Sequence, residues 1–389
     1  MTLVAGFEPD LAERHTRASF RAVVDRVVVP HAAEFDRASR VRADVLNEFG
    51  AQGFWGAVLP ERAGGTGRGM TAFGELHEEV GRGCSSMRSL LTVHSMALYA
   101  LDRWGGPALR EQWSAAMVSG KRLGAFCLTE PDAGSDFTAL STFATRDGDG
   151  YLLNGHKLWV TGGQLADVFL VFARTDRGPS AFFVSADQPG LHQIAVPEIM
   201  GTRGSQLAEI TFEDCYVGPE ALLGAEGMGL ALATNVLDIG RFSVAAGSVG
   251  ILQACLEACV SYANSRTQGG SLLREHQLIQ QMISTMATNT RAARLLVWQA
   301  GLLKEQGDPD TIMATCIAKQ FSATSAVAAA NDAVQLHGAL GCSDAYPVAR
   351  YLRDAKVMEI IEGSTQMQHV LISADACQNR GRIVPIDEH

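Results

Sequence analysis

The chain has 389 residues, of which 47% are hydrophobic and 19% charged, and 42 acidic against 32 basic residues give a formal net charge of −10. This is a globular composition, and the length suggests about two or three domains. The acidic balance argues against a nucleic-acid partner, because phosphate backbones are bound by clustered Lys and Arg, and no such cluster is present.

The cysteines and the apolar stretches bear on where in the cell the protein is expected. Eight cysteines are scattered without a C-x-x-C pair, and the first residues do not resemble a secretory signal. We therefore expect a reduced, cytoplasmic protein without a metal site. The most membrane-like stretch, residues 243–260, contains Gln253 and Glu257, so it predicts a buried helix and no membrane span.

Residues 1–120 predict a helical N-terminal domain. Apolar residues such as Phe20, Val24 and Val27 recur at three- and four-residue intervals, and Pro30 and Gly50 break the pattern.

The apolar period changes to two between residues 121 and 227, which predicts a small antiparallel β domain. The segment Asp147–Gly150 is typical of a hairpin turn between strands at 142–146 and 151–154. Asn154–Gly155 predicts a second turn, before a strand at 157–161.

Residues 228–389 return to helical periodicity and predict a C-terminal helical bundle, with long segments near 230–266, 276–306 and 309–340 and a polar tail at 379–389. The fold class is therefore α+β and mostly α. Strands and helices do not alternate, and no G-x-G-x-x-G follows a strand, which excludes a Rossmann-type nucleotide site.

Four stretches carry a family resemblance by their order and spacing: Phe-Cys-Leu-Thr-Glu-Pro-Asp-Ala-Gly-Ser-Asp at 126–136, Asn-Gly-His-Lys-Leu-Trp-Val-Thr at 154–161, Gln-Leu-His-Gly-Ala-Leu-Gly at 335–341, and 353–364, which ends in Ile-Glu-Gly-Ser. Together they resemble the flavin-dependent acyl-CoA dehydrogenase family over almost the whole chain. The resemblance implies a C-terminal four-helix bundle, FAD between the domains, and a homo-oligomer, either dimer or tetramer, whose neighbouring subunit completes the FAD site.

The first two stretches would contact the flavin ring. By position, Phe126, Leu128 and Thr129 would line the flavin, and Trp159 and Thr161 would cover its ring and hydrogen-bond near N5. Extended backbone and a hydroxyl suit a polar ring edge, and an indole offers a flat apolar face. Without its motif, Trp159 would be interpreted as a core aromatic of the sheet.

The resemblance assigns further cofactor contacts to positions near the C-terminus. The segment at 266–270 would reach the FAD diphosphate across the subunit interface, but Gly269 and Leu272 depart from the family pattern and put the adenine-end contacts in doubt. The assigned residues are Arg266, Gln268, Gln335, Gly338, Ser364 and Gln366.

Three residues are expected to bind the substrate. They are Ser135, Arg241 near the carrier end of the substrate, and Gly363, whose small size would let the backbone approach the thioester. Considered alone, Arg241 could instead pair with Asp238 at i, i+3.

Glu362 is the expected catalytic base. Dehydrogenating a saturated thioester requires removal of a weakly acidic α-proton while the β-carbon gives a hydride to flavin. Met358, Ile360 and Ile361 surround Glu362 with apolar side chains, which should raise the pKa of its carboxyl by desolvation. Glu359 matches no family base position and is expected to be structural.

Three functions compete at this point. The first is an FAD-dependent dehydrogenase of acyl thioesters on CoA or an acyl carrier protein, passing electrons to an electron-transfer flavoprotein; the stretch 341–364 resembles the branch that serves polyketide extender-unit biosynthesis. The second is a flavin oxidase or monooxygenase on the same fold. The third is a non-catalytic protein that keeps the fold for assembly, which the joint presence of Glu362, Trp159, Thr161, Arg266 and Gln335 disfavours.

Overall fold

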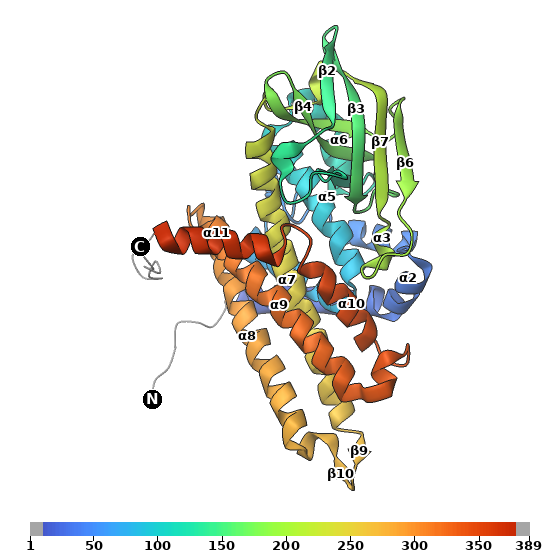
Figure 1. Ribbon diagram of the computed structural model, residues 1–389, viewed down its shortest axis with the longest axis vertical. Coiled ribbons are helices and arrows are strands. Elements are labelled where there is room, and N and C mark those ends of the chain that lie inside the picture. The colour runs from blue at the N-terminus through green and yellow to red at the C-terminus, as the bar shows by residue number, and fades with distance from the viewer. Residues whose placement is uncertain (1–10, 379–389) are drawn as a thin grey trace.

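The computed structural model describes residues 11–378, with helices at both ends of the chain and a sheet between them (Figure 1). This confirms the predicted α+β, mostly helical fold class. The predicted polar tail at 379–389 lies outside the described residues. The N-terminal helices are α1 (Leu11–Val27), α2 (Ala32–Ala38), α3 (Ala43–Ala51), α4 (Gly69–Gly83), α5 (Ser85–Trp104) and α6 (Pro107–Val118).

An eight-stranded sheet follows, with the order β6-β7-β3-β2-β4-β5-β8 and with β1 paired to β4. Most pairs are antiparallel, but β1 and β2 each run parallel to β4. The strands are β1 (Gly124–Cys127), β2 (Phe143–Asp147), β3 (Gly150–Val160), β4 (Val168–Thr175), β5 (Gly178–Ser185), β6 (Leu191–Ala195), β7 (Ala208–Val217) and β8 (Leu222–Leu223).

The predicted turn at Asn154–Gly155 is wrong, whereas the predicted hairpin at Asp147–Gly150 is confirmed as the β2–β3 connection. Strand β3 runs without a break from Gly150 to Val160, and its register with β7 shifts between Leu153 and Gly155. Gly155 has a φ of +152°, and a Cβ there would lie 2.6 Å from Thr142 Cβ. Glycine at this position therefore serves a bulge and a close approach within the sheet.

Residues 229–378 are helical apart from one short hairpin, β9–β10, which lies at the end of the molecule opposite the sheet (Figure 1). The elements are α7 (Gly229–Ala263), β9 (Thr267–Gln268), β10 (Ser271–Leu272), α8 (Gln277–Gln306), α9 (Thr311–His337), α10 (Val348–Met358) and α11 (Thr365–Gln378).

Helix α7 is the central element of the helical core. It is long and apolar enough to cross a membrane by length and composition, but 72% of its most apolar window is buried inside the fold, as in the core helix of a soluble protein. Glycines let α4 approach it closely: a Cβ on Gly81 would lie 2.8 Å from Gly247 Cα, and one on Gly250 would lie 2.5 Å from Arg82 N. Larger residues at these positions would force the two helices apart.

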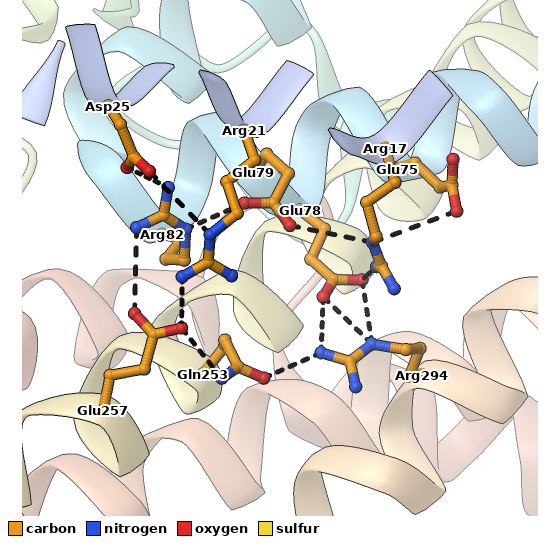
Figure 2. A network of polar contacts seen from close by, with 10 residues as sticks. All are labelled: Arg17, Arg21, Asp25, Glu75, Glu78, Glu79, Arg82, Gln253, Glu257 and Arg294. Carbon is orange, nitrogen blue, oxygen red and sulfur yellow. Dashed lines mark hydrogen bonds and ion pairs between the residues drawn. The ribbon is translucent and has the colours of Figure 1, made fainter. Parts of the chain in front are cut away.

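A network of charged side chains joins α1, α4, α7 and α8 (Figure 2). Arg294 Nη2 donates to Glu78 Oε1 over 2.7 Å, and Arg82 Nε donates to Glu79 Oε2 over 2.8 Å. We call this group the helix-joining network. Its members are Arg17, Arg21, Asp25, Glu75, Glu78, Glu79, Arg82, Gln253, Glu257 and Arg294.

Candidate active site

The structure brings together the two segments predicted to hold the flavin ring. The chain leaving β1 lies against the end of β3, where Leu158 N donates to Thr129 O over 2.9 Å. A buried ion pair supports this junction: Lys157 Nζ donates to Leu128 O over 3.2 Å and to Glu130 Oε1 over 2.7 Å. Although burial opposes ionisation, the Lys157 ammonium lowers the pKa of Glu130 to about 2.

Trp159 is an exposed indole at the end of β3. It is 57% exposed, so it is not a core aromatic of the sheet. Its φ of +57° is uncommon for a bulky residue and turns the side chain out of the regular strand alternation. Phe126 and Thr161 are half-buried and Leu128 is buried. An apolar platform beside extended backbone suits a planar ring with a polar edge.

Glu362 lies in the tight loop between α10 and α11. The φ of Glu362 is +54° and that of Gly363 is +88°, so two successive residues adopt the left-handed conformation. Lys319 Nζ donates to Gly363 O over 2.7 Å, and Gln368 Nε2 donates to the same carbonyl over 3.1 Å. Arg241 Nε donates to Glu362 O over 3.3 Å. Three side chains from three helices therefore hold the strained loop.

The Glu362 carboxyl points into the protein against α7. Its Oε2 atom is buried and has no hydrogen-bond partner among the described residues. A Cβ on Gly240 would lie 2.6 Å from Glu362 Cδ and 2.9 Å from Met96 Sδ, so only glycine leaves room here. Burial raises the pKa of Glu362 to about 7, and the charges of Arg241, Arg88 and Lys319 oppose this shift.

The remaining residues predicted to contact substrate or cofactor have simpler surroundings. Ser364 Oγ accepts from Met367 N over 3.3 Å at the start of α11, while Gln366 and Ser135 are exposed. Arg241 contacts the Glu362 carbonyl, and Asp238 forms its ion pair with Lys304 instead.

Glu359 has a structural environment. Its carboxylate accepts from Lys356 Nζ over 2.7 Å, and its carbonyl accepts from Thr365 N over 2.8 Å. These contacts stabilise the end of α10 and the start of α11.

The residues predicted for the FAD diphosphate lie elsewhere. Arg266 and Gln268 are exposed beside the β9–β10 hairpin, at the opposite end of the molecule from the sheet (Figure 1). Gln335 and Gly338 are exposed at the end of α9, and the stacked rings of Tyr262 and His337, 4.4 Å apart, place this end beside the end of α7. One chain therefore does not bring these residues to its own Trp159.

Sequence reasoning missed three residues around Glu362: Arg88, Lys319 and Gly240. The signal for Arg88 and Lys319 is a basic residue inside an otherwise apolar helical segment, and both side chains are fully buried. No local signal marks Gly240, because its contact with Glu362 joins positions far apart in the sequence.

Helix α5 connects the two halves of the candidate site. Leu90 contacts Gly162 just after β3, where an added Cβ would lie 3.1 Å from Leu90 Cδ2. Further along α5, Met96 lies against Gly240. One helix thus contacts both the strand that carries Trp159 and the surroundings of the Glu362 carboxyl.

Known proteins resemble this chain along almost its whole length. Models of the acyl-CoA dehydrogenase N-terminal, middle and C-terminal domains match residues 11–121, 125–215 and 227–376. The rat mitochondrial short-chain specific acyl-CoA dehydrogenase is 36% identical over 94% of this chain and 90% of its own length. The chain belongs to the acyl-CoA dehydrogenase family. It is accordingly an oxidoreductase of a family of FAD flavoproteins.

Solved structures of acyl-CoA dehydrogenases and related proteins share the fold. Butyryl-CoA dehydrogenase from Megasphaera elsdenii is 32% identical with a TM-score of 0.92, covering 95% of this chain and 99% of that one. FkbI, for biosynthesis of the methoxymalonyl extender unit of the polyketide Fk520, is 35% identical with a TM-score of 0.86, covering 92% and 99%. A glutaryl-CoA dehydrogenase from Mycobacterium smegmatis in complex with FADH2 is 28% identical with a TM-score of 0.91, covering 96% of each chain.

The residues of this member of the acyl-CoA dehydrogenase family fit FAD. The exposed Trp159 indole and the half-buried Phe126 and Thr161 offer the apolar surface and polar groups that a flavin ring requires. Within residues 11–378, no group of three or more His, Cys, Asp or Glu is placed to hold a metal ion.

Proposed function

We propose that this protein is an acyl-thioester dehydrogenase in which Glu362 removes the α-proton of the acyl group. The observation that carries the proposal is the buried Oε2 of Glu362, which has no protein partner in the described part of the chain. A free oxygen on a carboxyl whose pKa is raised by burial to about 7 suits a general base at neutral pH. Bound FAD would accept the hydride that leaves the β-carbon.

The surrounding residues would position this base. Lys319 and Arg241 fix the carbonyls of Gly363 and Glu362, so the loop backbone cannot turn away from α7. Gly240 gives the carboxyl room and Met96 excludes water beside it. The Glu362 N–H would donate to the thioester carbonyl and stabilise negative charge on its oxygen after proton removal.

Glu362→Gln tests this role. Glutamine keeps the size of the side chain but is not a base, so the variant should bind FAD and lose substrate-dependent bleaching of the flavin by roughly a hundred- to ten-thousand-fold. Anaerobic absorbance at the flavin band measures the effect. Glu359→Gln is the matched control and should bleach at the wild-type rate. Undiminished bleaching by Glu362→Gln would refute the assignment.

For the carrier, we propose an acyl carrier protein acting in polyketide extender-unit biosynthesis. The similarity to FkbI supports this proposal, as does the resemblance of residues 341–364 to the branch that serves polyketide extender-unit biosynthesis. Flavin reduction should be faster with an acyl group on carrier protein than with the same acyl group on CoA. A faster reaction with CoA would contradict the carrier-protein assignment and leave the role of Glu362 intact.

We further propose that subunits associate and share FAD sites. The β9–β10 hairpin, which holds Gln268, lies at the opposite end of the molecule from strand β3, which holds Trp159, so residues of a second subunit would be needed to complete each site. Light scattering should show a dimer or a larger oligomer, and Arg266→Ala should weaken FAD binding.

We propose an electron-transfer flavoprotein as the electron acceptor of the reduced flavin. Rapid release of hydrogen peroxide in air would favour an oxidase instead.

A further inference from the structure

Residues 198–206, which we call the strained segment, lie between β6 and β7 and have an unusual backbone conformation. Glu198, Thr202 and Gln206 have φ values of +55°, +51° and +50°, although none of them is glycine. The left-handed conformation is unfavourable for a residue with a side chain, above all for a β-branched threonine. Such strain persists only where the surrounding structure holds it, so the contacts of this segment with its neighbours determine its conformation.

Helix α10, which ends just before the proposed base, holds the middle of the strained segment. Thr202 N donates to Asp354 Oδ1 over 2.6 Å. A Cβ on Gly201 would lie 2.9 Å from Asp354 N, so the two backbones are in close contact. Asp354 is 3% exposed, and burying a carboxylate is unfavourable unless hydrogen bonds compensate for it. This buried acid therefore serves the contact between α10 and the strained segment.

The C-terminal end of the strained segment is bonded to the chain that follows β3. Gly162 N, three residues after Trp159, donates to Ser205 O over 2.8 Å. Gln164 N donates to Gln206 O over 3.3 Å. A shift of the strained segment would therefore move the end of β3 that is predicted to cover the flavin.

The N-terminal helices contact the strained segment from a third side. Gly204 N donates to Ser86 Oγ over 3.1 Å, and Val41 N donates to Gln206 Oε1 over 3.2 Å. A Cβ on Gly204 would lie 3.2 Å from Phe35 Cβ. One short segment thus contacts the N-terminal helices, the sheet and the C-terminal helices together.

We propose that the strained segment fixes the base relative to the flavin, and that Asp354 is the positioning residue that links this segment to Glu362. This inference rests on the proposed function. Glu362 takes the α-proton while the neighbouring β-carbon gives its hydride to bound FAD, so base and flavin need a fixed separation. Helix α5 is one connection between them. The path from Asp354 through the strained segment to Gly162 is a second.

Measuring the two steps separately tests this role. In deuterium oxide without oxygen, exchange of the α-proton of the thioester requires the base, whereas bleaching of the flavin requires hydride transfer as well. The probes are propanoyl, butanoyl and hexanoyl thioesters, each on CoA and on a carrier protein. The probe that bleaches wild-type enzyme fastest is used for the variants, and mass spectrometry of the recovered thioester measures the exchange.

Asp354→Leu should affect the two steps unequally. Bleaching should slow about 100-fold, because the base is displaced from the flavin, while α-proton exchange should slow by less than about fivefold. Asp354→Asn keeps an oxygen that accepts from Thr202 N, so it should restore bleaching to within about threefold of wild type.

Hydrogen exchange of the backbone gives a readout that does not depend on turnover. Gly162 N–H is bonded to the strained segment at Ser205 O, so loosening the segment at Asp354 should expose this amide to solvent. In enzyme loaded with FAD, the peptide covering residues 160–166 should exchange about tenfold faster in Asp354→Leu than in wild type. The same peptide in Asp354→Asn should exchange like wild type.

Glu305→Leu is the matched control. Glu305 Oε1 also accepts a backbone N–H from a distant element, Thr71 N over 2.7 Å, but it joins α8 to α4 and lies on neither connection between base and flavin. Its loss should leave the ratio of bleaching to α-proton exchange unchanged. Should Asp354→Leu fail to fold, Arg353→Met decides the matter, because it removes the hydrogen bond from α10 to Met200 O and should lower that ratio about tenfold.

Three outcomes would overturn the role of Asp354. Equal losses of bleaching and α-proton exchange in Asp354→Leu would show a merely structural carboxylate and leave the dehydrogenase function intact. Wild-type rates of both steps in a folded Asp354→Leu would exclude this connection between base and flavin. Neither exchange nor bleaching by wild-type enzyme with any probe would contradict this inference and the proposed function together.

Discussion

Two groups of buried charges in this protein are built in opposite ways. In the helix-joining network, every carboxylate of α4 that reaches the interior meets an arginine, and Glu78 contacts both Arg17 and Arg294 (Figure 2). Around Glu362, three cations lie near a carboxylate, yet none of them bonds to its oxygens. Paired charges join helices, whereas unpaired ones remain available to a ligand.

The comparison therefore separates stability from chemistry. Changes in the helix-joining network should lower the free energy of unfolding and leave the chemistry of the folded enzyme intact. Changes around Glu362 should alter rates and pH dependence with smaller effects on folding.

Glu78→Ala should cause the largest loss of stability. It leaves Arg17 and Arg294 without the carboxylate between them, and removing one partner of a buried ion pair costs about 3 kcal/mol or more. Urea unfolding measures the loss. The folded variant should still reduce its flavin at the wild-type rate. A large fall in that rate would contradict a purely structural role for the helix-joining network.

Gly240→Ala should slow flavin reduction by about 100-fold, equivalent to about 2.7 kcal/mol. The added methyl would lie 2.6 Å from Glu362 Cδ and would displace the base. FAD content and the thermal midpoint should change little. Gly106→Ala is the control, because nothing lies within 4 Å of its added Cβ. A normal rate in Gly240→Ala would show that the position of the carboxyl is not critical.

Lys319→Met should shift the pH profile. The wild-type rate should rise with pH through about 7, because Glu362 must be ionised to act as a base. The Lys319 charge lowers the pKa of Glu362, so its removal should raise that pKa and move the rise to higher pH. At pH 7 the rate should fall roughly tenfold.

Lys319→Gln separates the charge from the hydrogen bond. Glutamine can still donate to the Gly363 carbonyl but carries no charge, so its profile should shift like that of Lys319→Met while more of the maximal rate is kept. An unshifted profile in both variants would exclude an electrostatic role for Lys319.

Arg26→Ala should have the smallest effect. Arg26 Nη2 lies 2.9 Å from Glu48 Oε1, but its side chain is 61% exposed. Exposed pairs contribute little to the free energy of unfolding, because water screens the two charges. Urea unfolding should place this variant close to wild type, and a loss as large as that of Glu78→Ala would contradict the importance given to burial.

The order of helices and strands could be predicted from the sequence because it follows from local periodicity. The apolar neighbours of Glu362 likewise predicted a carboxyl with a raised pKa, since residues adjacent in the chain remain adjacent in the fold. The error at Asn154–Gly155 has a tertiary cause: a turn-forming dipeptide is held in a continuous strand by its pairing with β7.

The rest of the candidate site depends on contacts between distant positions. Arg88 meets Met358, 270 residues further along the chain, and Gly240 meets Glu362 through helix packing. No local pattern encodes such neighbours. Trp159 shows a related limit, because its strand alone favoured a core position and only the surrounding motif assigned the indole to the flavin; in the structure the indole is exposed.

Helix α5 sets the distance between the two halves of the candidate site. Leu90 and Met96 contact the two sides of the candidate site from one continuous helix, so the pitch of that helix sets their separation. One residue inserted between them would rotate Met96 by about 100° and advance it by about 1.5 Å. The same insertion between Gly148 and Asp149, which are exposed, would only lengthen the tip of the β2–β3 hairpin. We therefore expect insertions to be tolerated at the β2–β3 hairpin tip but not in the buried segment of α5 between Leu90 and Met96.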